Sequence, residues 1–280
     1  MTGVPPVRPI ALADILAARD RIAGTIVRTP LVRLEFGPGH PDIRLKLENL
    51  QPINAYKLRG AANAIALLSD AERARGVWTI SAGNAGQGVA YAARQAGIPC
   101  TVVAIETAPA AKLERMRALG ATLVLVPFEA AWKALEDHAF HGVEGVLIHP
   151  FAHHDFLAGH ATMALEILED APDVAAVIAG IGGGGLITAL GSAFRALKPE
   201  VRIFGAEPET AAPMALSLAK GSPQAVEGWT PSFVDGAGGR SVFPRMWERM
   251  RPVVDGCIVL SLEETRRAMR LLAETSRVIA

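Results

Sequence analysis

The fold is decided by one stretch of the sequence, Val174-Ala175-Ala176-Val177-Ile178-Ala179-Gly180-Ile181-Gly182-Gly183-Gly184-Gly185-Leu186. Its first six residues form a continuous apolar run, which is typical of a strand buried on both faces of a parallel sheet. Five of the next six residues are glycines, and an apolar helical run follows from Leu186 to Leu197. Glycine allows the backbone to turn sharply between the two elements. This strand–turn–helix unit predicts an α/β fold.

The same alternation of short apolar runs and helical runs extends along most of the chain. Strands are predicted at residues 77–80, 100–105, 121–126, 145–148, 174–179 and 201–204. Helices are predicted at residues 87–95, 110–119, 129–140, 156–168 and 186–197. Continuous apolar strands indicate burial under helices on both faces. We therefore expect an α/β fold with doubly wound parallel sheets.

The composition excludes several classes of protein. The 280 residues carry 28 basic and 28 acidic side chains, a balance that disfavours a nucleic-acid or anionic-membrane partner. No window reaches the ~18 apolar residues of a membrane span, and residues 1–10 contain no apolar signal segment. Only two cysteines occur, Cys100 and Cys257, each in a β-type run. This usage disfavours a disulfide framework and predicts a cytoplasmic protein.

The glycine-rich turn predicts a phosphate site. Glycine amides can point inward around an anion, and the N-terminus of the following helix adds partial positive charge. Gly180, Gly182 and Gly185 also satisfy the dinucleotide pattern G-x-G-x-x-G, with Glu207 at the end of the next strand. A dinucleotide site therefore competes on this motif alone. The first half of the chain decides between the two interpretations.

Two motifs in the first half of the chain bear on the choice between a dinucleotide site and another phosphate site. Lys57 follows an aromatic residue, Tyr56, at the predicted start of a helix, and Ser81-Ala82-Gly83-Asn84 forms a second glycine-containing turn. Taken alone, Lys57 is a solvated cation and Asn84 is a helix cap. Taken together with the distal glycine turn, they predict a ligand site at the carboxyl ends of parallel strands.

The order and spacing of these motifs resemble the threonine/serine dehydratase family of the pyridoxal-phosphate fold type II (tryptophan-synthase β-like) superfamily. The resemblance runs from about Leu12 to the end of the chain. Its motifs are E-N-L-Q-P at 48–52, Y-K-L-R-G-A at 56–61, S-A-G-N-A-G-Q-G at 81–88, G-G-G-G-L at 182–186 and G-A-E-P at 205–208. It implies two domains, a large one of residues 1–69 and 155–280 and a small one of residues 70–154.

The resemblance implies a role for each matching residue. Lys57 would bind pyridoxal 5'-phosphate covalently and later move the Cα proton. The other cofactor-binding residues would be Tyr56, Asn84, Gly182, Gly183, Gly184, Gly185 and Gly238. The substrate carboxylate would be bound by Ser81, Ala82, Gly83, Asn84 and Ala85, chiefly through their amides. The protein supplies orientation, and the cofactor withdraws electrons.

The implied activity is a β-elimination that converts a 3-hydroxy amino acid into a 2-oxo acid and ammonia. Two alternatives stay open: a β-replacement enzyme like cysteine synthase, and a non-catalytic relative that binds the cofactor or an amino acid. The expected partner is a small amino-acid substrate, in a homodimer or a higher homo-oligomer.

Some positions depart from the family pattern. Ala55 stands where a serine is usual, Ala85 where a histidine is common, and Ala82 where a racemase-type member has a second serine. Glu207 resembles the position where some members bind a structural cation, but Pro213 replaces the aspartate that often follows. A cation at Glu207 and a metal-free carboxylate both stay open.

Four histidines lack regular ligand spacing, which favours ordinary polar or packing roles over a metal site: His149, His153, His154 and His160.

A helix is predicted from Leu262 to Thr275, and the sequence ends shortly after it at Ala280. The family pattern continues with a turn, a helix and a strand. We therefore expect the C-terminal part of the large domain to be truncated in this sequence.

Overall fold

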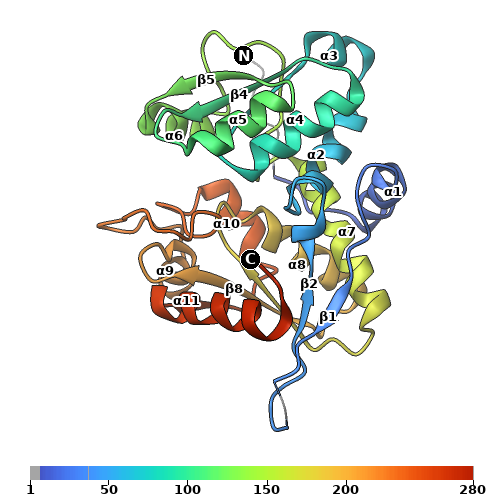
Figure 1. Cartoon of the computed structure of the whole chain (residues 1–280), viewed down its shortest axis with the longest axis vertical. Coiled ribbons are helices and arrows are strands. Elements are labelled where there is room, and N and C mark those ends of the chain that lie inside the picture. Colours follow the sequence, from blue (N-terminus) through green and yellow to red (C-terminus); the bar gives the residue numbers. More distant parts are fainter. Residues whose placement is uncertain (1–6, 37, 280) are drawn as a thin grey trace. The chain divides into compact units, whose positions relative to one another are not determined.

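The computed structural model describes residues 7–36 and 38–279 (Figure 1). The chain divides into two compact units. Unit 1 takes in the chain up to Ile26 and from Ala55 to Thr162, and unit 2 takes in Val27–Asn54 and the chain from Met163 onward. These bounds differ from those of the two domains implied by the family resemblance, and that division stays a prediction.

Unit 1 is built on a four-stranded parallel sheet in the order β5-β4-β3-β6. Its strands are β3 (Val77–Ile80), β4 (Cys100–Ile105), β5 (Thr122–Val126) and β6 (Val146–Leu147). All four residues of β3 are buried, as expected for a central strand between covering helices. The side chains of Trp78, Ile80 and Val103 form part of one buried apolar cluster with helix α6 (Phe128–Asp137).

Of the remaining helices of unit 1, α4 (Asn84–Ala96) and α5 (Ala110–Ala118) follow the predicted alternation. Helices α1 (Leu12–Ile22), α2 (Lys57–Ala66) and α3 (Asp70–Arg75) precede it in the chain. Helix α7 (His154–Asp170) begins in unit 1, where it packs closely on α2. A Cβ atom on Gly159 would lie 2.3 Å from the carbonyl oxygen of Arg59, so only glycine allows this approach.

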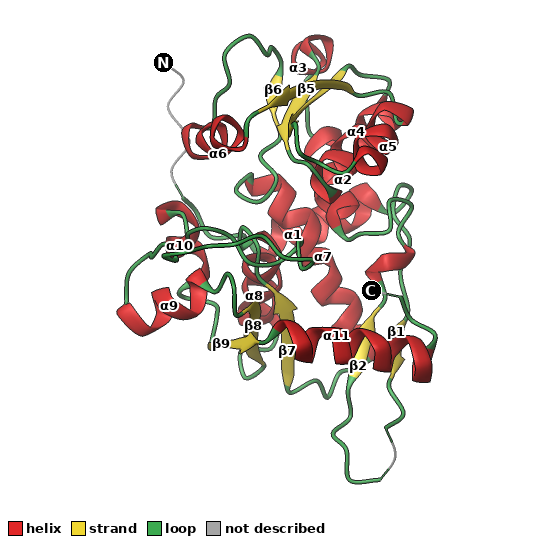
Figure 2. Cartoon of the chain, turned by 60° about the vertical axis from the view of Figure 1, so that its left-hand side comes forward, coloured by secondary structure: helices red, strands yellow, loops and turns green. Residues whose placement is uncertain are grey.

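Unit 2 contains a three-stranded parallel sheet in the order β7-β8-β9 (Figure 2). Its strands are β7 (Ala176–Gly180), β8 (Arg202–Pro208) and β9 (Gly256–Leu260). Its helices are α8 (Gly185–Leu197), α9 (Pro213–Lys220), α10 (Pro244–Met250) and α11 (Leu262–Leu271), followed by a π-helical turn (Leu272–Ser276). An antiparallel hairpin of β1 (Leu31–Arg33) and β2 (Arg44–Lys46) leads into a short 3-10 helix (Glu48–Leu50).

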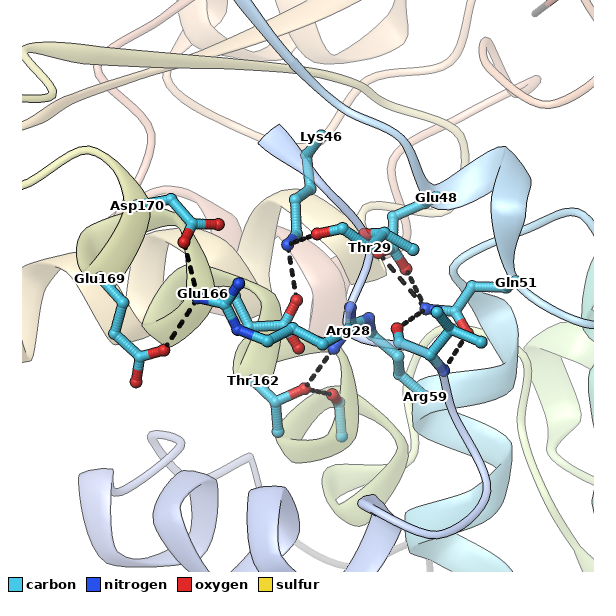
Figure 3. Close-up of polar contacts among 12 residues, drawn as sticks. Arg28, Thr29, Lys46, Glu48, Gln51, Arg59, Thr162, Glu166, Glu169 and Asp170 are labelled. Carbon is cyan, nitrogen blue, oxygen red and sulfur yellow. Dashed lines mark hydrogen bonds and ion pairs between the residues drawn. The ribbon is translucent and has the colours of Figure 1, made fainter. Parts of the chain in front are cut away.

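A buried polar network anchors the hairpin inside unit 2. The Lys46 ammonium lies 2.6 Å from the Glu166 carboxylate and also donates to the carbonyl oxygen of Thr29 (Figure 3). The Thr29 hydroxyl in turn donates to Glu48, whose carboxylate also accepts from Gln51 (Figure 3). Each buried polar group named here therefore has a partner, which a buried network requires.

The predicted α/β class with parallel sheets is confirmed. One expectation is wrong, because the predicted strands β5 and β7 are not buried on both faces. Leu125 is 43% exposed and Ile178 is 62% exposed. Each strand lies at the edge of its sheet, where fewer neighbours cover it. Within the described residues, no helix combines the length and the apolar character needed to cross a membrane.

Candidate functional site

Lys57 is the first residue of α2, and its side chain is half-buried within unit 1. Its ammonium Nζ donates a hydrogen bond to the carbonyl oxygen of Pro150 at 2.9 Å. Nζ also lies 5.2 Å from the ring centroid of Tyr56 and 5.7 Å from that of Phe156. Burial lowers the pKa of Lys57 from 10.5 to about 8. A sizeable fraction of neutral amine is therefore present near neutral pH, as a nucleophilic lysine needs.

The surroundings of Lys57 are aromatic and uncharged. The His160 ring packs edge-on against Tyr56, with centroids 4.8 Å apart, and against Phe156 at 4.6 Å. His160 is fully buried, and neither of its ring nitrogens has a hydrogen-bond partner among the described residues. Burial lowers the pKa of His160 well below its usual value, with Lys57 and Arg59 acting in the same direction. The imidazole is therefore neutral beside the lysine.

The second predicted motif of unit 1 forms the turn between β3 and α4. The Ser81 amide donates to Val103 at the end of the strand, and the Ser81 hydroxyl accepts a hydrogen bond from the Gly83 amide at 3.1 Å. Gly83, not Asn84, is the N-cap of α4, and the Asn84 side chain is exposed. The amides of this turn stand at the positive end of a 13-residue helix, which suits a carboxylate.

The glycine-rich turn lies in unit 2, between β7 and α8. No residue in the described part of the chain accepts a hydrogen bond from the amides of Gly182, Gly183 or Gly184. Gly184 adopts the left-handed conformation, with φ of +85°, and a Cβ atom there would lie 2.4 Å from the Met250 sulfur. Unpaired amides at a helix N-terminus are the donors that a phosphate group requires.

Gly238 joins this turn within unit 2. Its amide donates to the carbonyl oxygen of Ile181 at 2.7 Å, and its φ of +79° is in the left-handed region. A Cβ atom on Gly182 would lie 2.9 Å from the carbonyl oxygen of Gly236. The two glycine-containing loops thus lie against each other.

Glu207 is 1% exposed at the end of β8. Its carboxylate accepts hydrogen bonds from the amides of Met214 and Ala215, at 3.1 and 2.9 Å, and the Cys257 thiol donates to it at 3.3 Å. Burial raises the pKa of Glu207, and these hydrogen bonds oppose the rise. The N-terminal end of α9 and Cys257 are therefore partners that the motif did not reveal.

The four histidines singled out in the sequence have separate surroundings. His149 contacts the carbonyl oxygen of Leu135, and His154 contacts the Asp14 carboxylate at 3.0 Å. Among the residues that the structure describes, no group of three or more His, Cys, Asp or Glu side chains is arranged to hold a metal ion.

Each unit holds its part of the predicted residues in a form that fits pyridoxal phosphate. Unit 1 has a half-buried lysine of lowered pKa, and α2 and α4, which begin at Lys57 and Asn84, pack against each other. Unit 2 has unpaired glycine amides at a helix N-terminus. The chemistry of an amine for the aldehyde and of N–H donors for the phosphate matches the group.

Comparison with known proteins agrees with this class. The family model described as pyridoxal-phosphate dependent enzyme matches residues 22–280. The chain belongs to this family, and its fold is that of fold type II.

Within the family, the chain is similar to threonine-acting members. It is 38% identical to the L-threonine ammonia-lyase of Thermotoga maritima, over 97% of this chain and 68% of that protein. The structure of the processed form of threonine deaminase isoform 2 from Solanum lycopersicum has a TM-score of 0.83 and 28% identity, over 100% of this chain and 81% of that one. Serine racemase from Dictyostelium discoideum has a TM-score of 0.85 and 31% identity, over 96% and 87%.

Proposed function

We propose that this chain is a pyridoxal-phosphate-dependent ammonia-lyase, which converts a 3-hydroxy amino acid like threonine or serine into a 2-oxo acid and ammonia. The observation that carries the proposal is Lys57, half-buried among neutral rings, with its pKa lowered to about 8. The similarity to an L-threonine ammonia-lyase supports β-elimination as the reaction. Bound pyridoxal phosphate supplies the electron sink that makes the Cα proton acidic.

The residues of this chain orient the reactants and move protons. Lys57 would hold the cofactor and, once freed from it, would take the Cα proton at Nζ. Tyr56, Asn84 and Gly238 would help to hold the cofactor, Asn84 as a donor to its 3'-oxygen. The amides of Gly182, Gly183, Gly184 and Gly185 would bind its phosphate. These roles rest on the matching family motifs and on the geometry inside each unit.

The substrate carboxylate is assigned to the turn before α4. The Ser81 side chain and the amides of Ala82, Gly83, Asn84 and Ala85 would bind it, at the positive end of the helix. The Asn84 side chain at this turn is exposed. The Gly83 amide donates to the Ser81 hydroxyl, so it would exchange this acceptor for the carboxylate.

The family resemblance leaves a structural cation at Glu207 open, but three donors from the protein already contact this carboxylate and favour a metal-free site.

We further propose a homodimer or higher homo-oligomer in the cytoplasm. The cytoplasmic assignment rests on two cysteines, Cys100 and Cys257, that are both free thiols.

A substrate screen tests the activity. The cofactor-loaded chain is mixed with L-threonine, L-serine and a bulkier 3-hydroxy amino acid, and 2-oxo acid release is followed. We expect release from at least one of them. If 2-oxo acid is never released, and added sulfide instead replaces the β-hydroxyl to give a thiol amino acid and water, the β-replacement alternative holds. If neither product forms although the cofactor is bound, the chain is a binding protein.

A further inference from the structure

The Pro150 carbonyl oxygen is the hydrogen-bond acceptor for the Lys57 ammonium, at 2.9 Å. Pro150 lies in the loop between β6 and α7, outside any helix or strand. No carboxylate in the described part of the chain contacts Lys57. This carbonyl is therefore the group that stabilises the positive charge of a lysine that burial otherwise disfavours. Its position depends on whatever holds the loop.

The preceding residue, His149, holds that loop from both ring nitrogens. Its Nε2 lies 3.1 Å from the carbonyl oxygen of Leu135 in α6, so Nε2 carries the proton and donates it. Its Nδ1 accepts hydrogen bonds from the amides of Ala152 at 3.1 Å and Phe151 at 3.4 Å. One imidazole thus fastens the turn around Pro150 to the end of α6.

Packing and electrostatics keep this imidazole neutral. The ring is 2% exposed and stacks on His138, with centroids 4.3 Å apart. Burial lowers the pKa of His149 to about 3, and positive charge on His138, His153 and Lys57 contributes to this fall, against the hydrogen bond to Leu135. The Nδ1 lone pair therefore stays available to the loop amides at any pH at which an enzyme works.

We propose that His149 is a positioning residue, which holds the Pro150 carbonyl where it accepts a proton of the Lys57 ammonium. This inference rests on the proposed function, in which Lys57 becomes an ammonium after it takes the Cα proton. The carbonyl then stabilises the charged product of that step. The titratable side chains around Lys57 include those of Tyr56, His149 and His160, and both buried histidines are neutral.

Two substitutions separate the hydrogen bonds of His149. In His149→Asn, Oδ1 takes the place of Nδ1 and still accepts from the loop amides. In His149→Gln, Nε2 takes the place of the ring Nε2 and still donates to Leu135, but the acceptor for the loop is lost. The matched control is His141→Gln, which changes an exposed histidine of the preceding loop.

The readout is the pKa of Lys57 in the full-length, cofactor-free chain, so it does not depend on turnover. Acetylation of Lys57 by acetic anhydride is followed against pH by peptide mass spectrometry. We expect an inflection near pH 8 in the natural sequence. His149→Asn and the control His141→Gln should keep the inflection near this pH. His149→Gln should lower the inflection by about one pH unit, because the Lys57 ammonium loses a fixed acceptor.

An unchanged inflection in His149→Gln overturns the inference, and so does an equal fall in His149→Asn, which would point to ring stacking instead. Circular dichroism confirms that each variant is folded. If the Gln variant does not fold, the Asn variant still decides, because a lowered inflection there contradicts the proposed role of the acceptor and a retained one supports it. The substrate screen tests the lyase activity separately, so failure of that activity is distinguishable.

Discussion

At the scale of single residues, Lys57 combines a lowered pKa with a backbone acceptor and neutral rings. We predict that Lys57→Ala abolishes both the visible absorbance band of the lysine-bound cofactor and the release of 2-oxo acid. The physical reason is that no second amine replaces Nζ at the start of α2. Lys57→Arg, which keeps the charge but cannot form the bond, serves as the control. A persistent lysine band in either variant would contradict the assignment.

A second prediction concerns the residue after Ser81. We expect no appreciable racemisation of the substrate, because the methyl group of Ala82 offers neither a proton donor nor a base on the second face of Cα. The similarity to a serine racemase makes this test informative. Chiral chromatography of residual L-serine after incubation in deuterated water measures it. Rapid accumulation of D-serine would refute the prediction, and Ala82→Ser is the matched variant in which some inversion is expected.

Some residues of the candidate site can be predicted from the sequence, and others cannot. Lys57 is singled out by the order of the motifs around it, which resembles that of a known family, and not by its own two residues. The Pro150 carbonyl cannot be found in this way, because every residue has a carbonyl and only the tertiary structure selects one. The burial of Ala85, at 5% exposure, is equally hidden, since its neighbours come from distant parts of the sequence.

At the scale of elements, long continuous apolar runs predict strands well. The predicted strands at 77–80 and 100–105 match β3 and β4 to the residue. The hairpin of β1 and β2 escapes prediction, because strands of three residues are too short for any periodicity to emerge. Its stability comes from long-range partners rather than from its own sequence, as the contact between Lys46 and Glu166 illustrates.

The ion pair between Lys46 and Glu166 should contribute to the free energy of unfolding. The side chains of Lys46 and Glu166 are only 7% and 9% exposed. Lys46→Met leaves a buried carboxylate without this cation and should cost roughly 3–5 kcal/mol of unfolding free energy. Asp42→Asn, which removes an exposed partner of Arg44, should cost much less, because solvent screens that pair. Urea unfolding measures the loss of unfolding free energy in both variants. Equal losses would contradict the prediction that the buried ion pair contributes more than the exposed one.

At the scale of the whole molecule, each unit, taken by itself, contains groups whose chemistry suits pyridoxal phosphate. Unit 1 offers an amine and a helix N-terminus, and unit 2 offers unpaired glycine amides. The class of the fold follows from the alternation of strands and helices, and the family from the order of the motifs. The partners of Glu207 do not follow, because α9 and Cys257 reach it through tertiary contacts that lie outside any motif.

Those partners lead to a prediction about metal ions. Both Glu207 oxygens accept hydrogen bonds from the N-terminal end of α9, and Oε2 also accepts from Cys257, so the carboxylate is stabilised without a cation. We expect removal of divalent ions by chelation to leave the melting temperature of the protein unchanged. Glu207→Gln should lower it, because the NH2 group of the amide replaces one of the two acceptor oxygens and leaves an amide of α9 without its acceptor. A melting temperature that falls on chelation and recovers with Mg²⁺ or Ca²⁺, but only when Glu207 is intact, would instead establish the cation at this position.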